Sequence, residues 1–140
     1  MHPMTPTLFI SHGAPTFALE PGEAGAALSA LGRRLLPLTA VLIVSPHWMT
    51  ADYAVTAAAA PRTLHDFGGF APALQRLTYP APGHPALAAE VAQLLRHAGL
   101  AATLDAQRGL HHGAWVPLMH LLPAATTPVL QLSMPADLDA

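Results

Sequence analysis

Two histidines of the chain each follow a short apolar run. His12 comes after residues 7–11, and His47 comes after residues 40–45 and Pro46. Ligands collect at the carboxyl ends of the strands in open α/β sheets, and neutral imidazole is the commonest protein ligand for transition metals. Parallel strands lie about 5 Å apart, so two imidazoles that leave adjacent strands in one direction can share a cation. The separation of the two histidines suits one strand–helix–strand crossover and predicts half of a metal site.

A second group of candidate residues lies in predicted loops. His65 precedes Asp66, which indicates either a carboxylate-oriented histidine or an Asx turn, and the turn is the favoured interpretation. His111 and His112 are adjacent and are followed by Gly113. Adjacent histidines cannot both enter the core, and glycine allows a ligand to approach the backbone closely. We therefore expect at least one of this pair to face a pocket.

Other residues have ordinary structural interpretations. Trp48 and Trp115 could form aromatic walls, but core packing is the favoured interpretation for both. His97 lies near the end of a predicted helix, where a cation interacts favourably with the helix dipole. The sequence contains no G-x-S-x-G, Walker, G-x-G-x-x-G or H-E-x-x-H motif, so serine hydrolysis, phosphate binding and zincin proteolysis lack support.

The composition indicates one domain with a single core. The chain has 140 residues, of which 52% are hydrophobic and 10% charged, as expected for a folded domain. Six Lys and Arg against eight Asp and Glu create no basic field, so we expect no nucleic-acid partner. Without cysteine, any metal must be bound by nitrogen and oxygen ligands. Neither a signal peptide nor a membrane-spanning apolar run is evident, which predicts a cytoplasmic protein with no membrane partner.

Hydrophobic patterning predicts the elements that position these residues. Strands are expected over residues 7–11, 40–45, 53–57, 100–104 and 129–133, and helices over residues 25–36, 85–99 and 116–122. This order predicts an α/β fold, a three-layer sandwich around a largely parallel or mixed sheet. Few residues follow the run at 129–133, so we expect that strand to lack a covering helix and the fold to be truncated.

Five sequence blocks occur in one order along the chain: LFISHGAP at 8–15, VSPHW at 44–48, HDFGGF at 65–70, YPAPG at 79–83 and HGAWVPL at 112–118. Together they resemble the DODA-type class III extradiol ring-cleavage dioxygenases of the LigB-like superfamily. The resemblance runs from about Thr7 to Ser133. It implies that residues 1–140 are the N-terminal part of a single catalytic domain whose C-terminal half is absent.

The resemblance also implies an activity and a site. The activity is oxidative opening of catechol-type aromatic rings, such as DOPA-like catechols, with dioxygen and a non-heme divalent metal, Fe(II) or Zn(II). His12 and His47 match metal ligands, and His112 matches a catalytic histidine. The weaker candidates for the substrate pocket are His65, Asp66, Trp48, His111 and Trp115.

Two departures from the family pattern bear on this site. His111 stands where the family has an aspartate, which removes an acceptor carboxylate that could orient His112. The family's third metal ligand and a further catalytic histidine lie in the half that is absent here. The residues present are therefore expected to form an incomplete site.

The residues alone leave two other classes open. One is a zinc-dependent α/β hydrolase, because the same two histidines could hold zinc with water as the nucleophile. The other is a non-catalytic metal-binding module or subunit whose missing ligand comes from another chain. For the favoured class the expected partners are a small aromatic catechol and dioxygen, and the sequence leaves a homo-oligomer open.

Overall fold

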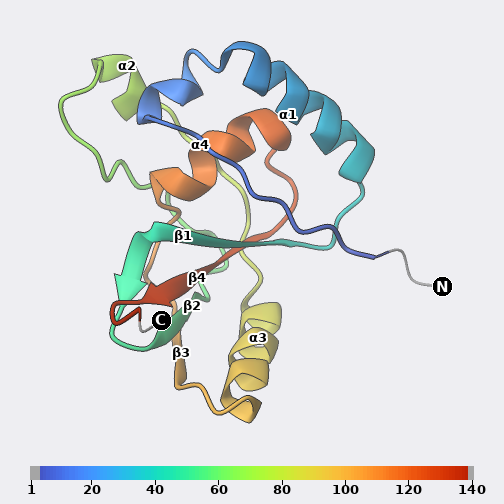
Figure 1. Cartoon of the computed structure of the whole chain (residues 1–140), viewed down its shortest axis with the longest axis vertical. Helices are drawn as coiled ribbons and strands as arrows, with labels where there is room; N and C mark the ends of the chain where they lie inside the picture. Colours follow the sequence, from blue (N-terminus) through green and yellow to red (C-terminus); the bar gives the residue numbers. More distant parts are fainter. Residues whose placement is uncertain (1–3, 139–140) are drawn as a thin grey trace.

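A four-stranded sheet forms the centre of the computed structural model, which describes residues 4–138 (Figure 1). The strands are β1 (Val41–Thr50), β2 (Tyr53–Thr56), β3 (Ala102–Asp105) and β4 (Val129–Pro135), in the spatial order β1-β4-β2-β3. β1 is parallel to β4 and β2 is parallel to β3, whereas β2 and β4 are antiparallel. The sheet is therefore mixed, and β1 and β3 are its edge strands.

Helices cover both faces of this sheet. They are α1 (Gly22–Leu35), α2 (Pro72–Gln75), α3 (Pro85–His97) and α4 (His112–Leu121), with a short 3-10 helix at Pro15–Ala18. In Figure 1, α1 and α4 lie on one side of the strands and α3 lies on the other. Side chains alternate between the two faces along a strand, so Val129 of β4 joins the core under α4 and Leu130 joins the core under α3. The predicted three-layer α/β arrangement is confirmed.

The strand predicted over residues 7–11 was wrong. Residues 4–13 have no regular secondary structure, and the side chain of Phe9 is 99% exposed. A strand requires a neighbour that pairs with its backbone amides, and none of the strands within residues 4–138 pairs with this segment. His12 therefore leaves a loop and not the end of a strand.

Strand β1 continues through Pro46 to Thr50, beyond the predicted strand over residues 40–45. Its register against β4 is interrupted between Val44 and Met49. Proline cannot donate a backbone hydrogen bond and is tolerated on edge strands and at irregularities, and β1 is an edge strand. His47 consequently lies inside this irregular part of β1 and not after the strand.

The C-terminal elements also differ in detail from the prediction. Helix α4 begins at His112 and not after Trp115, so His112 lies in the first helical turn and not in a loop. Strand β4 is buried on both faces, since Val129 and Leu130 are each 1% exposed. The uncovered apolar face belongs to β1 instead, where Leu42 is 48% and Val44 is 54% exposed.

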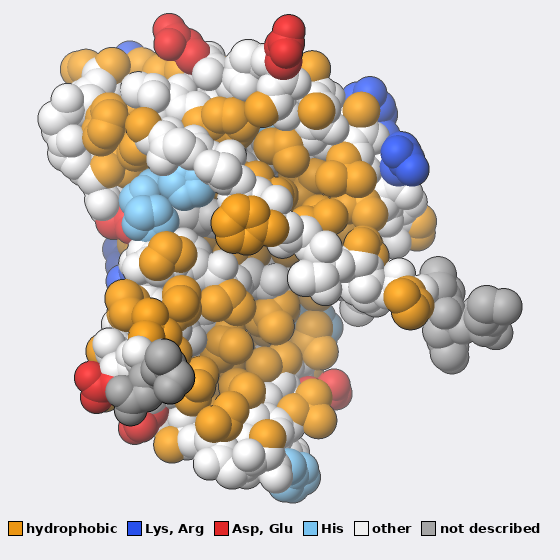
Figure 2. Space-filling view, viewed as in Figure 1, with side chains coloured by type: hydrophobic (Ala, Val, Ile, Leu, Met, Phe, Trp, Pro, Cys, Tyr) orange, Lys and Arg blue, Asp and Glu red, His pale blue; other side chains and the backbone are white. Residues whose placement is uncertain are grey.

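Figure 2 shows hydrophobic side chains spread over much of the face seen there, with histidine side chains among them. Within residues 4–138, no helix combines the length and the apolar character needed to cross a membrane.

Candidate metal centre

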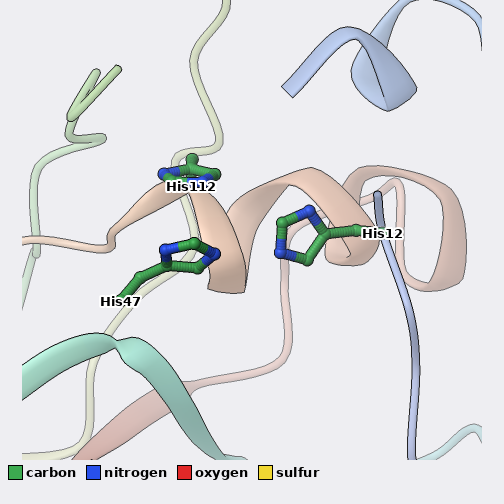
Figure 3. Close-up of side chains that lie close together, drawn as sticks. All are labelled: His12, His47 and His112. Carbon is green, nitrogen blue, oxygen red and sulfur yellow. The ribbon is translucent and has the colours of Figure 1, made fainter. Parts of the chain in front are cut away.

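Three imidazoles from distant parts of the chain meet at one end of the sheet (Figure 3). His12 comes from the N-terminal loop, His47 from β1 and His112 from the start of α4. One ring nitrogen of each lies within 4.8 Å of the ring nitrogens of the other two. The ring centroids of His47 and His112 are 4.1 Å apart, and His12 lies 5.4 Å from His47 and 5.5 Å from His112. The structure therefore brings together the two histidines predicted as ligands and the histidine predicted as catalytic.

Asp66 holds His112 in this cluster. Its Oδ1 accepts a hydrogen bond from the backbone N–H of His112 at 2.9 Å and lies 3.0 Å from His112 Nδ1. His111, the N-cap residue of α4, makes no side-chain capping bond. The carboxylate thus satisfies one of the free N–H groups at the positive end of this helix. Sequence favoured an Asx turn for Asp66, whereas its carboxylate contacts a residue far along the chain.

Burial and the neighbouring imidazoles favour the neutral form of His12 and of His47. Burial lowers the pKa of His12, and the neighbouring His112 and His47 lower it further. Burial and His112 also lower the pKa of His47, while Asp66 acts in the opposite direction. For Asp66, burial would raise the pKa, but its hydrogen bonds with His112 bring it below its usual value. Neutral imidazoles beside an ionised carboxylate are the protonation states that metal binding requires.

The residues present fit a divalent transition metal. Nδ1 of His12 is buried and has no hydrogen-bond partner among residues 4–138, so a lone pair there is available to a ligand. Imidazole nitrogen suits zinc and iron. His47 is exposed, which leaves the cluster open to solvent on one side.

His111 does not join the cluster. Its side chain is 1% exposed, and burial lowers its pKa to about 4. Its backbone N–H donates to Oε1 of Gln131, whose Nε2 donates to the Gly109 carbonyl. His112 lies in the cluster and His111 packs in the interior. Both side chains are buried, so the premise that adjacent histidines cannot both enter the core was wrong. Sequence reasoning missed Gln131, although an amide in the apolar run of β4 was a visible signal.

The other pocket candidates have structural roles. Trp115 is fully buried and its indole Nε1–H donates to the Leu64 carbonyl at 2.7 Å. A ring nitrogen of His65, Nε2, lies 2.7 Å from the Leu77 carbonyl oxygen. Trp48 is buried beneath the guanidinium of Arg108, which lies 5.4 Å from its ring centroid. Both tryptophans therefore pack as the favoured interpretation predicted, and His65 anchors a loop.

One residue beside the cluster was not singled out from the sequence. The ring of Phe67 lies edge-on to His112, with 5.6 Å between the centroids. Phe67 directly follows Asp66 in the block HDFGGF, so the signal was an aromatic residue in a loop that already carried a carboxylate. Phe67 provides an apolar wall next to the imidazoles.

An open α/β sandwich with clustered imidazoles at one end of its sheet defines the chain as a candidate metal-dependent enzyme of the α/β class. Residues 6–137 match the family described as "Catalytic LigB subunit of aromatic ring-opening dioxygenase", and the chain belongs to this LigB family. The predicted resemblance is thereby confirmed.

Several named proteins are similar to this chain. It is 43% identical over 130 residues to "4,5-DOPA dioxygenase extradiol" of Escherichia coli (strain K12), a match that covers 92% of this chain and 47% of the relative. The protein of the same name from Beta vulgaris is 39% identical over 137 residues, covering 95% and 51%. A crystal structure of an uncharacterised protein from Escherichia coli K12 superimposes with a TM-score of 0.61 at 36% identity, over 80% of this chain and 40% of that one. The chain thus spans about half the length of the relatives it matches.

Proposed function

We propose that this chain supplies the metal-holding part of an extradiol ring-cleavage dioxygenase that opens catechol-type aromatic rings with dioxygen. The observation that carries the proposal is the cluster of His12, His47 and His112, whose ring nitrogens lie within 4.8 Å of one another in a chain of the LigB family. The names of the relatives support a DOPA-like catechol as the substrate. The cysteine-free composition supports a cytoplasmic location.

His12 and His47 are the proposed metal ligands, and Fe(II) or Zn(II) is the proposed metal. Nδ1 of His12 has no hydrogen-bond partner within the described part of the chain. This free nitrogen and the lowered pKa of both imidazoles support this role. When bound, a divalent metal would lower the pKa of a catechol hydroxyl and hold the substrate in place. With only two protein ligands the affinity for the metal is expected to be weak.

His112 is the proposed catalytic residue. Its Nδ1 lies against Asp66, which leaves Nε2 to take a proton from a catechol hydroxyl. A positioned imidazole of this kind contributes about 10²- to 10⁴-fold to a proton-transfer step. Phe67, whose ring lies 5.6 Å from that of His112, would contact the aromatic ring of the substrate and exclude water from one side.

The proposal is tested with the purified chain, loaded separately with Fe(II) and Zn(II) and mixed with DOPA in air. We expect slow oxygen uptake together with the yellow absorbance of an opened ring, slow because only two protein ligands hold the metal, and both signals should be lost in His112→Ala. Hydrolysis of esters or amides that does not respond to oxygen would favour a zinc hydrolase instead. Metal uptake without either reaction would favour a metal-binding module.

A further inference from the structure

We propose that Asp66 is a positioning residue that fixes the orientation of His112 and places its ring proton on Nδ1. The inference rests on the proposed function only for the proton transfer from the catechol hydroxyl to His112. Asp66 does not itself touch the substrate. It acts through the imidazole that it holds.

The hydrogen bonds of Asp66 determine where the proton lies. The backbone N–H of His112 can only donate, so Asp66 Oδ1 is the acceptor of that 2.9 Å bond. An ionised carboxylate has no proton to donate. The second contact, 3.0 Å from Oδ1 to the ring, therefore requires a hydrogen on Nδ1. Nε2 of a neutral His112 is then unprotonated and can accept a proton.

The loop that carries Asp66 is fastened on both sides. On the N-terminal side, the Leu64 carbonyl accepts a hydrogen bond from Nε1 of Trp115 at 2.7 Å. On the C-terminal side, the Phe67 carbonyl accepts one from Nε2 of Gln75 at 3.3 Å. Trp115 and His112 belong to the same helix, α4. The loop that carries Asp66 is therefore bound to α4 through Trp115, and Asp66 itself also contacts His112 of the same helix.

This anchoring matters because burial alone does not hold Asp66 in place. Its side chain is 28% exposed, whereas that of His112 is 9% exposed. A half-exposed carboxylate on a free loop would exchange its hydrogen bonds with water. With the loop fastened at Leu64 and Phe67, the carboxylate is pre-organised, and the imidazole loses little freedom when it adopts the required orientation.

The direct test is the ring-nitrogen spectrum of His112 in the metal-free protein. Nitrogen-15 NMR at about pH 8, above the ordinary imidazole pKa, separates the two neutral tautomers. We expect a protonated Nδ1 and a non-protonated Nε2 in the wild type, and a shift of the proton to Nε2 in Asp66→Ala. Asp52→Ala, which removes a carboxylate from an exposed position, is the matched control and should keep the wild-type spectrum.

Asp66→Leu keeps a side chain of similar length and covers the case in which Asp66→Ala does not fold. Leucine offers no acceptor to Nδ1, so the same shift of the proton to Nε2 is expected. Retention of the proton on Nδ1 in either folded variant would overturn the inference.

A second readout separates this inference from the proposed function. In the loaded protein, Asp66→Leu should lower kcat for ring opening by about 10²- to 10⁴-fold, with zinc retention in equilibrium dialysis unchanged. If the wild type opens no catechol but the tautomer shifts in the variants, the proposed function fails and the positioning role stands. If ring opening occurs and the variants keep both kcat and the tautomer, the positioning role fails and the function stands.

Discussion

The backbone of Gly113 lies directly against the imidazole of His47. A Cβ at position 113 would lie 2.6 Å from Cδ2 of His47 and 2.5 Å from Oγ of Ser45. Both distances are shorter than ordinary van der Waals contacts between such atoms. Glycine in the first turn of α4 therefore lets His47 approach His112 until the ring centroids are 4.1 Å apart.

Gly113→Ala should disturb the cluster more than the fold. We expect the new methyl group to displace His47, reduce zinc affinity about tenfold or more and destabilise the protein by about 1–3 kcal/mol. Equilibrium dialysis with zinc and urea unfolding measure the two effects. Gly68→Ala is the control, because a Cβ there meets nothing within 4 Å. Wild-type zinc affinity in Gly113→Ala would show that the close approach does not position the ligand.

His12→Ala and His47→Ala should each abolish metal retention. Each removes one of the two proposed ligands, and the remaining imidazole cannot chelate the ion alone. Equilibrium dialysis with Fe(II) and Zn(II) measures the loss. His97→Ala removes an exposed histidine of α3 and should behave as wild type. Unchanged binding in both cluster variants would disprove the assignment.

His112→Ala should separate catalysis from metal binding. We expect ring opening to fall about 10²- to 10⁴-fold while zinc and iron retention stay near the wild-type level. Oxygen uptake and dialysis on the same preparation measure the two quantities. Loss of the metal together with the activity would make His112 a third ligand and contradict its assignment as an acid–base group.

Stability should decrease on acidification. Burial lowers the pKa of His111 from 6.5 to about 4, so between these values the unfolded chain binds more protons than the folded one. The stability that depends on the neutral ring is present above about pH 6.5 and is lost as the pH falls toward 4, a loss of roughly 3 kcal/mol. The lowered pKa values of His12 and His47 act in the same direction.

Urea unfolding at about pH 7.5 and about pH 5 measures this dependence. His111→Leu replaces a buried ring whose Nδ1 finds no hydrogen-bond partner in the described structure, residues 4–138. The substitution should flatten the pH dependence without a large loss of stability at neutral pH. A slope equal to that of the wild type would assign the effect to other groups.

Local patterns predicted most of the regular elements. The apolar run at 129–133 and the helical periodicity at 85–99 correspond to β4 and α3. Such patterns show which side of an element is buried, and they can be recognised in a short window of consecutive residues. Residues 7–11 have a similar apolar run, yet no strand within the described chain pairs with them. Pairing is a long-range property that the run itself does not encode.

The sequence by itself determined the candidate histidines, the family and the α/β class. Residue types, the order of the sequence blocks and hydrophobic periodicity can all be recognised without knowing which segments meet in space. Only the tertiary structure decided that His111 turns inward and that His112 joins His12 and His47. It also decided that Asp66 provides a carboxylate for His112, where the sequence predicted that His111 had removed one. These contacts join segments far apart along the chain, and the folded backbone alone sets their distances.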